Sequence, residues 1–434
     1  MESGGGVDCD SVGTDTSVSG QETDVGALWH PFSDMGAVER DGEFVIARGD
    51  GVHVFDAAGN RYLDATAGLW FTNVGHGRAE LAEAAADQMR TIAAYSTFGD
   101  YVTQSTVELA EKLAGIAPVP GSKVFFTSGG SDSVETAAKL ARRYWVETGR
   151  PSKRFVIGRQ KAYHGMHYAG TALAGIPGNR EGYGVLVAES ATVAWDDVED
   201  LRATIERIGP ENVAAFFCEP VMGAGGVYPP PEDYLAGVRK LCTEMDVLFV
   251  ADEVVTGYGR IGGSWFASTR FGLEPDMVTT AKGLTSGYLP MGAVLVAPKV
   301  ADPFFQPDGG VWLRHGYTYS GHATAAAVAL ANLAIIEREG LLDQASRLES
   351  TLAERLRPLA DHERVAEVRC GVGALAAVQL ADPGEAIGVA KRLRAFGVAT
   401  RAVGAGGLQI SPAFVMSDDE VQELADSIAR ALDA

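Results

Sequence analysis

Apolar strands alternate with helical segments through the middle of the chain, and this alternation constrains the fold more than any other feature. Nearly continuous apolar runs separated by helix-spaced segments are typical of a parallel sheet covered by helices on both faces. The expected strands are KVFFT (123–127), RFVIG (154–158), VAAFFCEPV (213–221), VLFVADEVV (247–255), MVTTA (277–281) and GAVLVA (292–297). The expected helices include DSVETAAKLARRYW (132–145) and DYLAGVRKLCTEM (233–245). The sequence therefore predicts an α/β fold with a mainly parallel central sheet.

The regions on either side of this alternation have different patterns. Residues 43–70 alternate apolar and polar side chains, with turn signals at GDG and AAGN, and this predicts an antiparallel meander. Beyond about residue 330, mixed helical and strand-like stretches predict a smaller α+β domain. We therefore expect four parts, namely a disordered acidic tail (1–24), an N-terminal segment (25–70), a large domain (71–328) and a small C-terminal domain (329–434).

The charge of the chain excludes some partners. Lys and Arg total 36 and Asp and Glu total 57, which gives a formal net charge of −21. Sequence-independent nucleic-acid binding needs a basic surface, so we expect no nucleic-acid partner. The most apolar stretch, Ala323–Ile336, is too short to cross a bilayer and predicts a buried helix, so we expect no membrane partner.

The compartment is expected to be the cytoplasm. The N-terminus has neither the basic region nor the apolar region of a secretory signal. The cysteines are far apart and form no C-x-x-C pair, so we expect reduced thiols, with neither disulfides nor a zinc site. They are Cys9, Cys218, Cys242 and Cys370.

Four polar side chains come at or just after the ends of expected strands. They are Thr127, Glu219, Asp252 and Lys282. Ligands of such sheets bind at the carboxyl ends of the strands. A lysine held dry at a strand end has a lowered pKa, and its neutral amine can form a Schiff base with an aldehyde. Asp252 could face the same cleft, although an acid capped or paired for structural reasons would give the same pattern.

The stretch TSGGSDSVETAAKL (127–140) predicts a strand end, a tight turn and a helix start near Ser131 or Asp132. Glu135 stands in the capping-box position relative to Asp132. Unpaired N–H groups at such a helix start suit a phosphate, although an ordinary glycine-bearing turn would show the same pattern. The stretch is not a Walker A motif, because it lacks G-K-[ST].

Two further stretches suggest chemistry that we do not favour. KAYHGMHYAG (161–170) contains His164 and His167, but no nearby acid or cysteine completes a ligand set, so we expect no metal. Tyr163 in the same loop could instead stack on a flat ring. GYGRIG (257–262) matches G-x-G-x-x-G, but it does not directly follow the strand and leads into a poor helix start, so an NAD-dependent oxidoreductase is a remote alternative.

Taken together, these parts could hold pyridoxal phosphate. The set contains a Schiff-base lysine, a phosphate-binding helix start, a stacking ring and an acid. The acid would keep the pyridine nitrogen positive, which makes the cofactor ring an electron sink. From about Leu28 onward the chain resembles the class III aminotransferases of fold type I, particularly the ω-amino acid:pyruvate transaminases. The shared motifs are GLWFTNVGHG (68–77), FFTSGGSDSVETAAKLAR (125–142), YHG (163–165), CEPVMGAGGV (218–227), ADEVVTGYGR (251–260), TTAKG (279–283) and HGYTYSGH (315–322).

The resemblance implies a role for each residue of the cofactor site. Lys282 would be the Schiff-base lysine and the proton carrier, and Asp252 would pair with the pyridine nitrogen. Tyr163 would stack on one ring face and Val254 would pack on the other. The remaining implied cofactor-binding residues are Gly130 and Ser131 at the phosphate, Glu219 beside Asp252, His164 in the YHG motif, and Thr318, which would reach the phosphate from another subunit. The expected assembly is a homodimer, with a tetramer as the alternative.

The resemblance also implies a substrate pocket. Trp70 would form the wall beside the amine side chain, with Trp29, Phe32 and Phe98 as further candidates. Arg401 would bind the carboxylate of the keto acid and swing away for an amine, although a surface arginine before a loop would look the same. The stretch departs from the family where an acidic or polar residue often follows the glycine, because AGG stands there.

The expected activity is a ping-pong transfer of an amino group from an ω-amino acid or primary amine to a keto acid, with pyruvate as the expected acceptor. An aminomutase or racemase of the same fold would use the same lysine and is the alternative. The sequence does not select among β-alanine, taurine, putrescine-like diamines and arylalkyl amines as donors.

Overall fold

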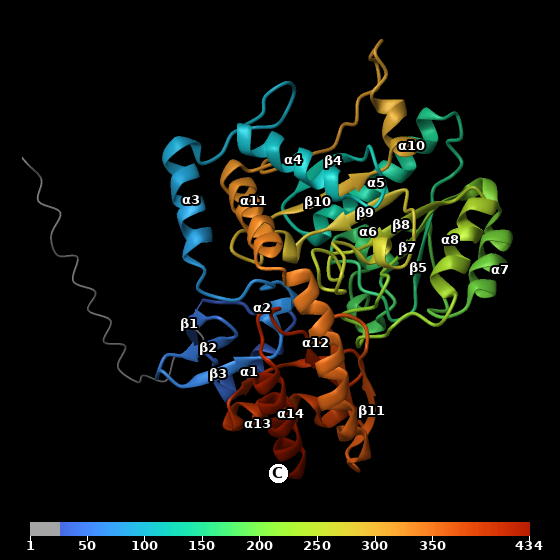
Figure 1. Cartoon of the computed structure of the whole chain (residues 1–434). Coiled ribbons are helices and arrows are strands. Elements are labelled where there is room, and N and C mark those ends of the chain that lie inside the picture. Colours follow the sequence, from blue (N-terminus) through green and yellow to red (C-terminus); the bar gives the residue numbers. More distant parts are fainter. Residues whose placement is uncertain (1–26) are drawn as a thin grey trace, which may run out of the picture. The chain divides into compact units, whose positions relative to one another are not determined.

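The computed structural model describes residues 27–434, which form two compact units (Figure 1). The first unit runs to Arg48 and includes Phe55–Arg61, and the second contains Gly49–Val54 and Tyr62–Ala434. The acidic tail predicted for residues 1–24 lies outside the described residues. The other predicted domain boundaries stay predictions.

The first unit contains α1 (Met35–Asp41). This helix begins where the Asp34 carboxylate accepts a hydrogen bond from the Ala37 N–H at 3.2 Å, a typical N-cap contact. Strands β1 (Ile46–Asp50), β2 (His53–Asp56) and β3 (Arg61–Asp64) follow, in the range where alternation predicted a meander. Within the second unit, β3 pairs in parallel with β13 (Val398–Ala399).

The second unit is built on a seven-stranded sheet in the order β4-β10-β9-β8-β7-β5-β6. The strands are β4 (Lys123–Thr127), β5 (Phe155–Arg159), β6 (Ser190–Val193), β7 (Val213–Cys218), β8 (Leu248–Asp252), β9 (Met277–Thr280) and β10 (Gly292–Val296). The sheet is mainly parallel, as predicted. One strand, β10, runs antiparallel to both β9 and β4, so the sheet is mixed. The segment between β9 and β10 is too short for the helical crossover that a parallel connection requires.

Helices cover both faces of this sheet. Adjacent residues on a strand point to opposite faces, so Phe216 packs in the apolar cluster that includes α4, α7, α8 and α11, whereas Phe217 packs in the cluster with α5 and α6. Figure 1 shows α7 and α8 together beside β5 and β7. The helix bounds are α4 (Gln104–Ile116), α5 (Gly130–Glu147), α6 (Tyr168–Leu173), α7 (Val198–Ile208), α8 (Tyr234–Glu244) and α11 (Ala323–Arg338). The buried helix predicted over Ala323–Ile336 is confirmed, and it continues across the predicted boundary after residue 328.

The C-terminal part combines helices with an antiparallel sheet, as the predicted α+β content requires. Its four-stranded sheet has the order β11-β12-β15-β14. The elements are α12 (Leu341–Leu356), β11 (Val365–Arg369), β12 (Ala376–Leu380), α13 (Ala386–Leu393), β14 (Ala402–Val403), β15 (Gly407–Ile410) and α14 (Asp418–Asp433). The remaining helices are α2 (Ala67–Trp70), α3 (Ala79–Ile92), α9 (Ala267–Arg270) and α10 (Pro298–Ala301). Among residues 27–434, no helix combines the length and apolarity needed to cross a membrane.

Candidate active site

The sheet order brings the polar strand ends together. Strands β9, β8 and β7 are neighbours and run in parallel, so the residues that end or follow them meet at one edge. Lys282 lies two residues beyond β9 at the start of a short turn, with φ 41°, and it is partly buried. This left-handed conformation is strained for a residue with a side chain, and such strain is concentrated at functional sites.

Burial is the main influence on the ionisation of Lys282. Desolvation lowers the pKa of its amine below the ordinary value, and the nearby Arg401 lowers the pKa further. Asp252 and Glu219 act in the opposite direction, because their negative charges favour the ammonium form. The net lowering leaves a larger fraction of the amine neutral, and the neutral amine is the nucleophilic form.

Asp252 ends β8 and is held by three neutral or weakly basic groups. His164 Nδ1 lies 2.7 Å from one carboxylate oxygen. The other oxygen accepts hydrogen bonds from the Thr279 hydroxyl at 3.0 Å and from the Val254 N–H at 3.2 Å. Asp252 is buried, and the second ring nitrogen of His164 is buried without a hydrogen-bond partner in the described part of the chain.

Glu219 connects the end of β7 to the loop that contains Tyr163. One of its oxygens accepts from the Tyr163 N–H and the other from the Gly223 N–H, both at 2.9 Å. Burial is the largest effect and raises the pKa of this carboxyl, and the charge of Asp252 raises the pKa further. Glu219 therefore positions two loops at the same edge of the sheet.

Asp252 and Glu253 are adjacent in the sequence, but the structure gives them different tasks. Glu253 accepts hydrogen bonds from the N–H groups of Ala267 at 2.5 Å and Ser268 at 2.8 Å, so it satisfies the first turn of α9. Asp252 contacts His164, because successive side chains of a strand point to opposite sides. Of these two acids, only Asp252 therefore belongs to the site.

Helix α5 begins at Gly130, immediately after the turn that the sequence predicted. Its cap residue is Gly129, and no side chain caps it, so the predicted capping box with Glu135 is wrong. Glu135 instead accepts a hydrogen bond from the Ala169 N–H at 3.1 Å, because α6 packs against α5. A Cβ added at Gly130 would lie 2.8 Å from the Val254 side chain, so the helix start and Val254 are in close contact.

The remaining residues of the loop region lie around this helix start. Ser131 Oγ accepts from the Met166 N–H at 3.1 Å, and Thr127, which ends β4, has its hydroxyl 2.7 Å from that of Ser133. His167 lies 2.7 Å from Asp132, so each histidine of this loop has an acid beside it. Within residues 27–434 no group of three potential ligands is suitable for a metal ion.

The predicted substrate-pocket residues are found in different surroundings. Trp70 is 2% exposed, with φ 68°, and belongs to an apolar cluster with Val221, Val227 and Val403. Phe98 is 56% exposed, and Thr318 is also exposed in the single chain. Trp29 and Phe32 belong to the first unit, where both are largely exposed, and their part in a pocket stays a prediction.

Arg401 lies within electrostatic range of the site. Tyr163 raises the pKa of the Arg401 guanidinium, although burial is the larger effect and lowers that pKa. In return, Arg401 lowers the pKa of Tyr163, which burial raises overall. The structure thus brings Lys282, Asp252, Glu219, Tyr163 and Arg401 together.

Two contacts at the site were not foreseen from the sequence. Thr279 supports Asp252, and Gln409 accepts a hydrogen bond from Arg401. A polar residue in the middle of the apolar strand GLQI was a usable signal for Gln409, because buried amides need partners.

The glycine-rich GYGRIG segment shows no dinucleotide-binding geometry. Tyr258 and Arg260 are fully buried in it, and the Gly257 N–H bonds the Glu253 carbonyl oxygen in a turn. The next helix, α9, begins only at Ala267, whereas a dinucleotide-binding turn opens a helix directly.

Comparisons with known proteins agree with this geometry. The class-III aminotransferase family model matches residues 35–432. The putrescine–pyruvate aminotransferase of Pseudomonas aeruginosa is 39% identical over 432 residues, covering 93% of this chain and 93% of that protein. The β-alanine–pyruvate aminotransferase of the same organism is 34% identical over 437 residues, covering 95% of this chain and 96% of that protein. The solved structure of an amine transaminase from an uncultivated Pseudomonas species, in its pyridoxal-phosphate-bound form, has a TM-score of 0.88 at 36% identity, covering 94% of this chain and 98% of that one.

Proposed function

The chain belongs to the class-III aminotransferases, which depend on pyridoxal phosphate, and we propose that it moves the amino group of an ω-amino acid or primary amine to pyruvate. The observation that supports this most directly is the edge of the sheet where Lys282, with its lowered pKa, stands near a fixed Asp252. Both named relatives use pyruvate, and they differ in the amine, which is putrescine for one and β-alanine for the other.

The contacts around this edge fit pyridoxal phosphate. An ionised carboxylate has about four lone-pair positions, and Asp252 uses three of them within the described residues, which leaves one for the pyridine N–H. The start of α5 has no side-chain cap, so its N–H groups at Gly130 and Ser131 suit a phosphate. Tyr163 and Val254 would cover the two faces of the ring. Glu219 would hold the backbone of Tyr163 in place, and His164 would hold Asp252.

When bound there, pyridoxal phosphate supplies an electron sink for the bond that breaks at the substrate Cα. The negative charge of Asp252 would keep the ring nitrogen protonated, and the hydrogen bond from Thr279 would keep that carboxylate in position. Lys282 would attach the cofactor through Nζ. Once displaced by the substrate amine, this Nζ would remove the Cα proton and deliver it again, as general base and then general acid. Arg401 would bind the carboxylate of the keto acid.

The amine donor is testable with a panel of amines. Putrescine, β-alanine, taurine and an arylalkyl amine should each be incubated with the holoenzyme and pyruvate, and alanine should be measured. We expect alanine from putrescine or β-alanine, with Trp70 and Phe98 as walls of the amine pocket. Isomerised substrate without alanine would instead indicate an aminomutase or racemase, and this would overturn the proposal.

We also propose that the enzyme is a homodimer whose sites are shared between subunits. Thr318 is exposed, and exposed apolar side chains extend from α3 into the start of α4. They are Met89, Ile92, Tyr95, Phe98, Tyr101, Val102 and Val107. Many exposed apolar side chains within one segment are typical of a protein–protein interface.

A complementation experiment tests the shared site. Lys282→Ala and Thr318→Ala proteins should each have little activity. If Thr318 serves the partner's cofactor, refolding the two together should restore about a quarter of wild-type activity, since half of the dimers are mixed and each has one complete site. No recovery in mixed dimers would contradict the shared site, and sedimentation would distinguish a dimer from a tetramer.

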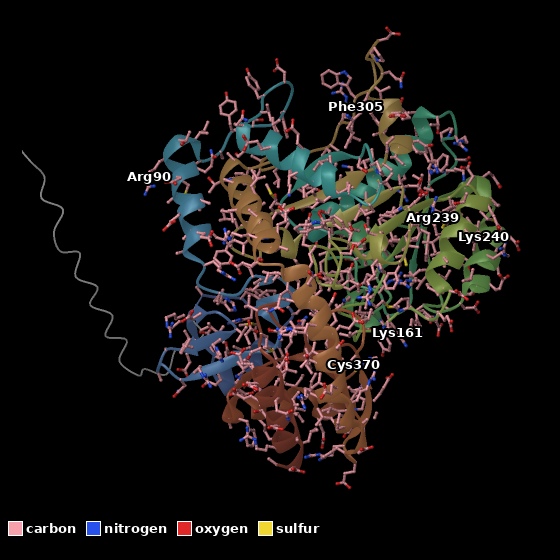
Figure 2. All side chains as sticks on the ribbon, viewed as in Figure 1. Arg90, Lys161, Arg239, Lys240, Phe305 and Cys370 are labelled. Atoms are coloured by element: carbon pink, nitrogen blue, oxygen red, sulfur yellow. The ribbon has the colours of Figure 1, made fainter. Side chains whose placement is uncertain are left out.

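We place the enzyme in the cytoplasm. Cys218, Cys242 and Cys370, the last labelled in Figure 2, are free thiols. Burial raises the pKa of the Cys218 thiol to about 11, so it stays protonated and unreactive. Cell fractionation that recovers the protein outside the cytoplasm would contradict this assignment.

A further inference from the structure

Arg401 is an arginine without an acidic partner. Its Nε donates a hydrogen bond to Gln409 Oε1 at 2.6 Å. Neither Nη group makes a hydrogen bond or an ion pair within residues 27–434, and Tyr163 is the one charged or titratable group there that raises the pKa of Arg401. Although neighbouring groups desolvate the guanidinium in part, the residue keeps solvent-accessible surface, so a solute can reach it. An arginine fixed at Nε with both Nη groups available is suited to a carboxylate, which it can bind through two parallel N–H bonds.

Gln409 is held so that its oxygen is the atom that faces Arg401. The residue is fully buried, and its side-chain NH₂ donates to Ser411 Oγ at 2.8 Å. Ser411 donates its single hydroxyl proton to the Thr66 carbonyl oxygen at 3.1 Å, so it can only accept from Gln409. This direction of hydrogen bonding fixes the amide orientation, with its oxygen toward Arg401. The backbone supports the pair as well, because the Gln409 N–H bonds the Arg401 carbonyl oxygen at 3.0 Å.

The same chain of hydrogen bonds ends at the segment that contains Trp70. The Thr66 carbonyl oxygen that accepts from Ser411 also accepts from the Trp70 N–H at 2.9 Å. The Thr66 hydroxyl in turn bonds Asp64 at 2.8 Å. Arg401 and the turn before Trp70 are therefore connected through two buried side chains, Gln409 and Ser411.

We propose that Gln409 is a positioning residue that holds Arg401 through one neutral hydrogen bond and so keeps both Nη groups available for the carboxylate of the keto acid. This inference rests on the proposed function of the site. The neutrality of the amide matters, because a glutamate at the same position would offer the same oxygen with a full negative charge. It would then compete with the substrate carboxylate for the guanidinium.

The test compares the two half-reactions in single-turnover experiments on the holoenzyme. Gln409→Glu adds the competing charge with almost no change in shape, and Gln409→Met removes the hydrogen bond. We expect Gln409→Glu to weaken pyruvate binding about tenfold or more, and Gln409→Met to weaken it about threefold to tenfold. The half-reaction with putrescine, which has no carboxylate, should change by less than about twofold in either variant.

Gln379→Met is the matched control. Gln379 lies on the neighbouring strand β12, accepts from Arg369 Nη2 at 2.9 Å, and donates to the Ala405 carbonyl oxygen at 2.7 Å. It therefore supports the loop after Arg401 without touching that arginine. An equal loss of pyruvate binding in Gln379→Met would show that general loosening of the loop is enough, and the proposal would be wrong. Equal slowing of both half-reactions by the Gln409 variants would likewise overturn it.

Binding of propionate, a carboxylate that cannot react, separates this proposal from the proposed function. Calorimetry on the holoenzyme should show propionate binding that is lost in Gln409→Glu and retained in Gln379→Met. If no amine yields alanine but this pattern holds, the proposed reaction fails and the carboxylate site stands. If Gln409→Glu binds propionate as well as the wild type does, the assignment of Gln409 is refuted whatever the reaction.

Discussion

Two adjacent threonines before Lys282 should have separable effects when each is replaced by valine, which has nearly the same shape. Thr279 and Thr280 are both fully buried on β9 and point to opposite faces of the sheet. The Thr279 hydroxyl donates to Asp252 at 3.0 Å, in register with it across β8 and β9. The Thr280 hydroxyl donates to the Ala293 carbonyl oxygen at 3.1 Å and accepts from the Tyr258 hydroxyl at 2.9 Å. We therefore expect Thr279→Val to affect catalysis and Thr280→Val to affect stability.

The contacts give the size of each effect. A hydrogen bond to a charged group contributes about 1.5–3 kcal/mol, which corresponds to roughly 10- to 150-fold in kcat/KM if it acts fully in the transition state. Asp252 keeps His164 and Val254 as partners, so we expect the lower end, about tenfold. Thr280→Val leaves the fully buried Tyr258 hydroxyl unpaired, which should lower the free energy of unfolding by about 1–3 kcal/mol.

The assays are steady-state kinetics with the best amine donor and pyruvate, titration of the apoenzyme with pyridoxal phosphate, and denaturant unfolding. Thr279→Val should lose cofactor affinity and kcat/KM with little change in unfolding, and Thr280→Val should show the reverse. If Thr279→Val keeps kcat/KM within about twofold of wild type, the carboxylate does not depend on this hydroxyl. If both variants lose the same kcat/KM, the face-by-face assignment is wrong.

Three further substitutions test separate parts of the site. Gly130→Ala should weaken pyridoxal phosphate binding, as measured by fluorescence titration, because the new Cβ would lie 2.8 Å from Val254 and must displace it; unchanged affinity would show that this contact is unimportant. In the apoenzyme, Lys282→Met should melt at a higher temperature than wild type at neutral pH. The lowered pKa means that the Lys282 amine binds its proton less tightly in the folded chain than in the unfolded chain, and this destabilises the folded wild type. This difference should shrink as the pH rises toward the ordinary lysine value of 10.5, and a difference that grows would refute the sign. Arg401→Met should abolish propionate binding but leave the putrescine half-reaction within about twofold, and retained propionate binding would locate the carboxylate elsewhere.

The elements of the large sheet could be predicted because local pattern determines them. The apolar runs at β4, β7, β8 and β9 are long enough, and their flanking helices periodic enough, to place each strand within a few residues. The direction of β10 depended instead on the length of one connection, which the pattern of apolar residues does not encode. The capping of α5 could not be predicted either, because Glu135 bonds α6 across a tertiary contact.

At the site, sequence reasoning found the charged residues and missed the neutral ones that hold them. Lys282 and Asp252 stand out because charged groups are rare at the ends of buried strands, and Arg401 was found through the family resemblance. Thr279 does not stand out, because threonine is common in strands, and although Gln409 is a polar residue in an apolar strand, its partner depends on strand register and loop conformation. The AGG stretch after Arg401 left the position of that arginine open in the sequence, and the structure supplies the missing polar contact from Gln409 on β15.

The charges around Lys282 share one property that connects these contacts. Asp252 is held by a hydroxyl, a backbone N–H and an imidazole, and Glu219 by two backbone N–H groups. Arg401 is held by an amide. None of these six contacts joins a carboxylate to a lysine or an arginine, so each charge is fixed in place without a directly bonded lysine, arginine or carboxylate of opposite charge. For the buried Asp252 and Glu219 this arrangement costs folding stability, because buried charges without counter-ions are poorly solvated. It also means that the strongest electrostatic partners for Asp252 and Arg401 are groups that arrive with ligands, a protonated ring nitrogen for one and a carboxylate for the other.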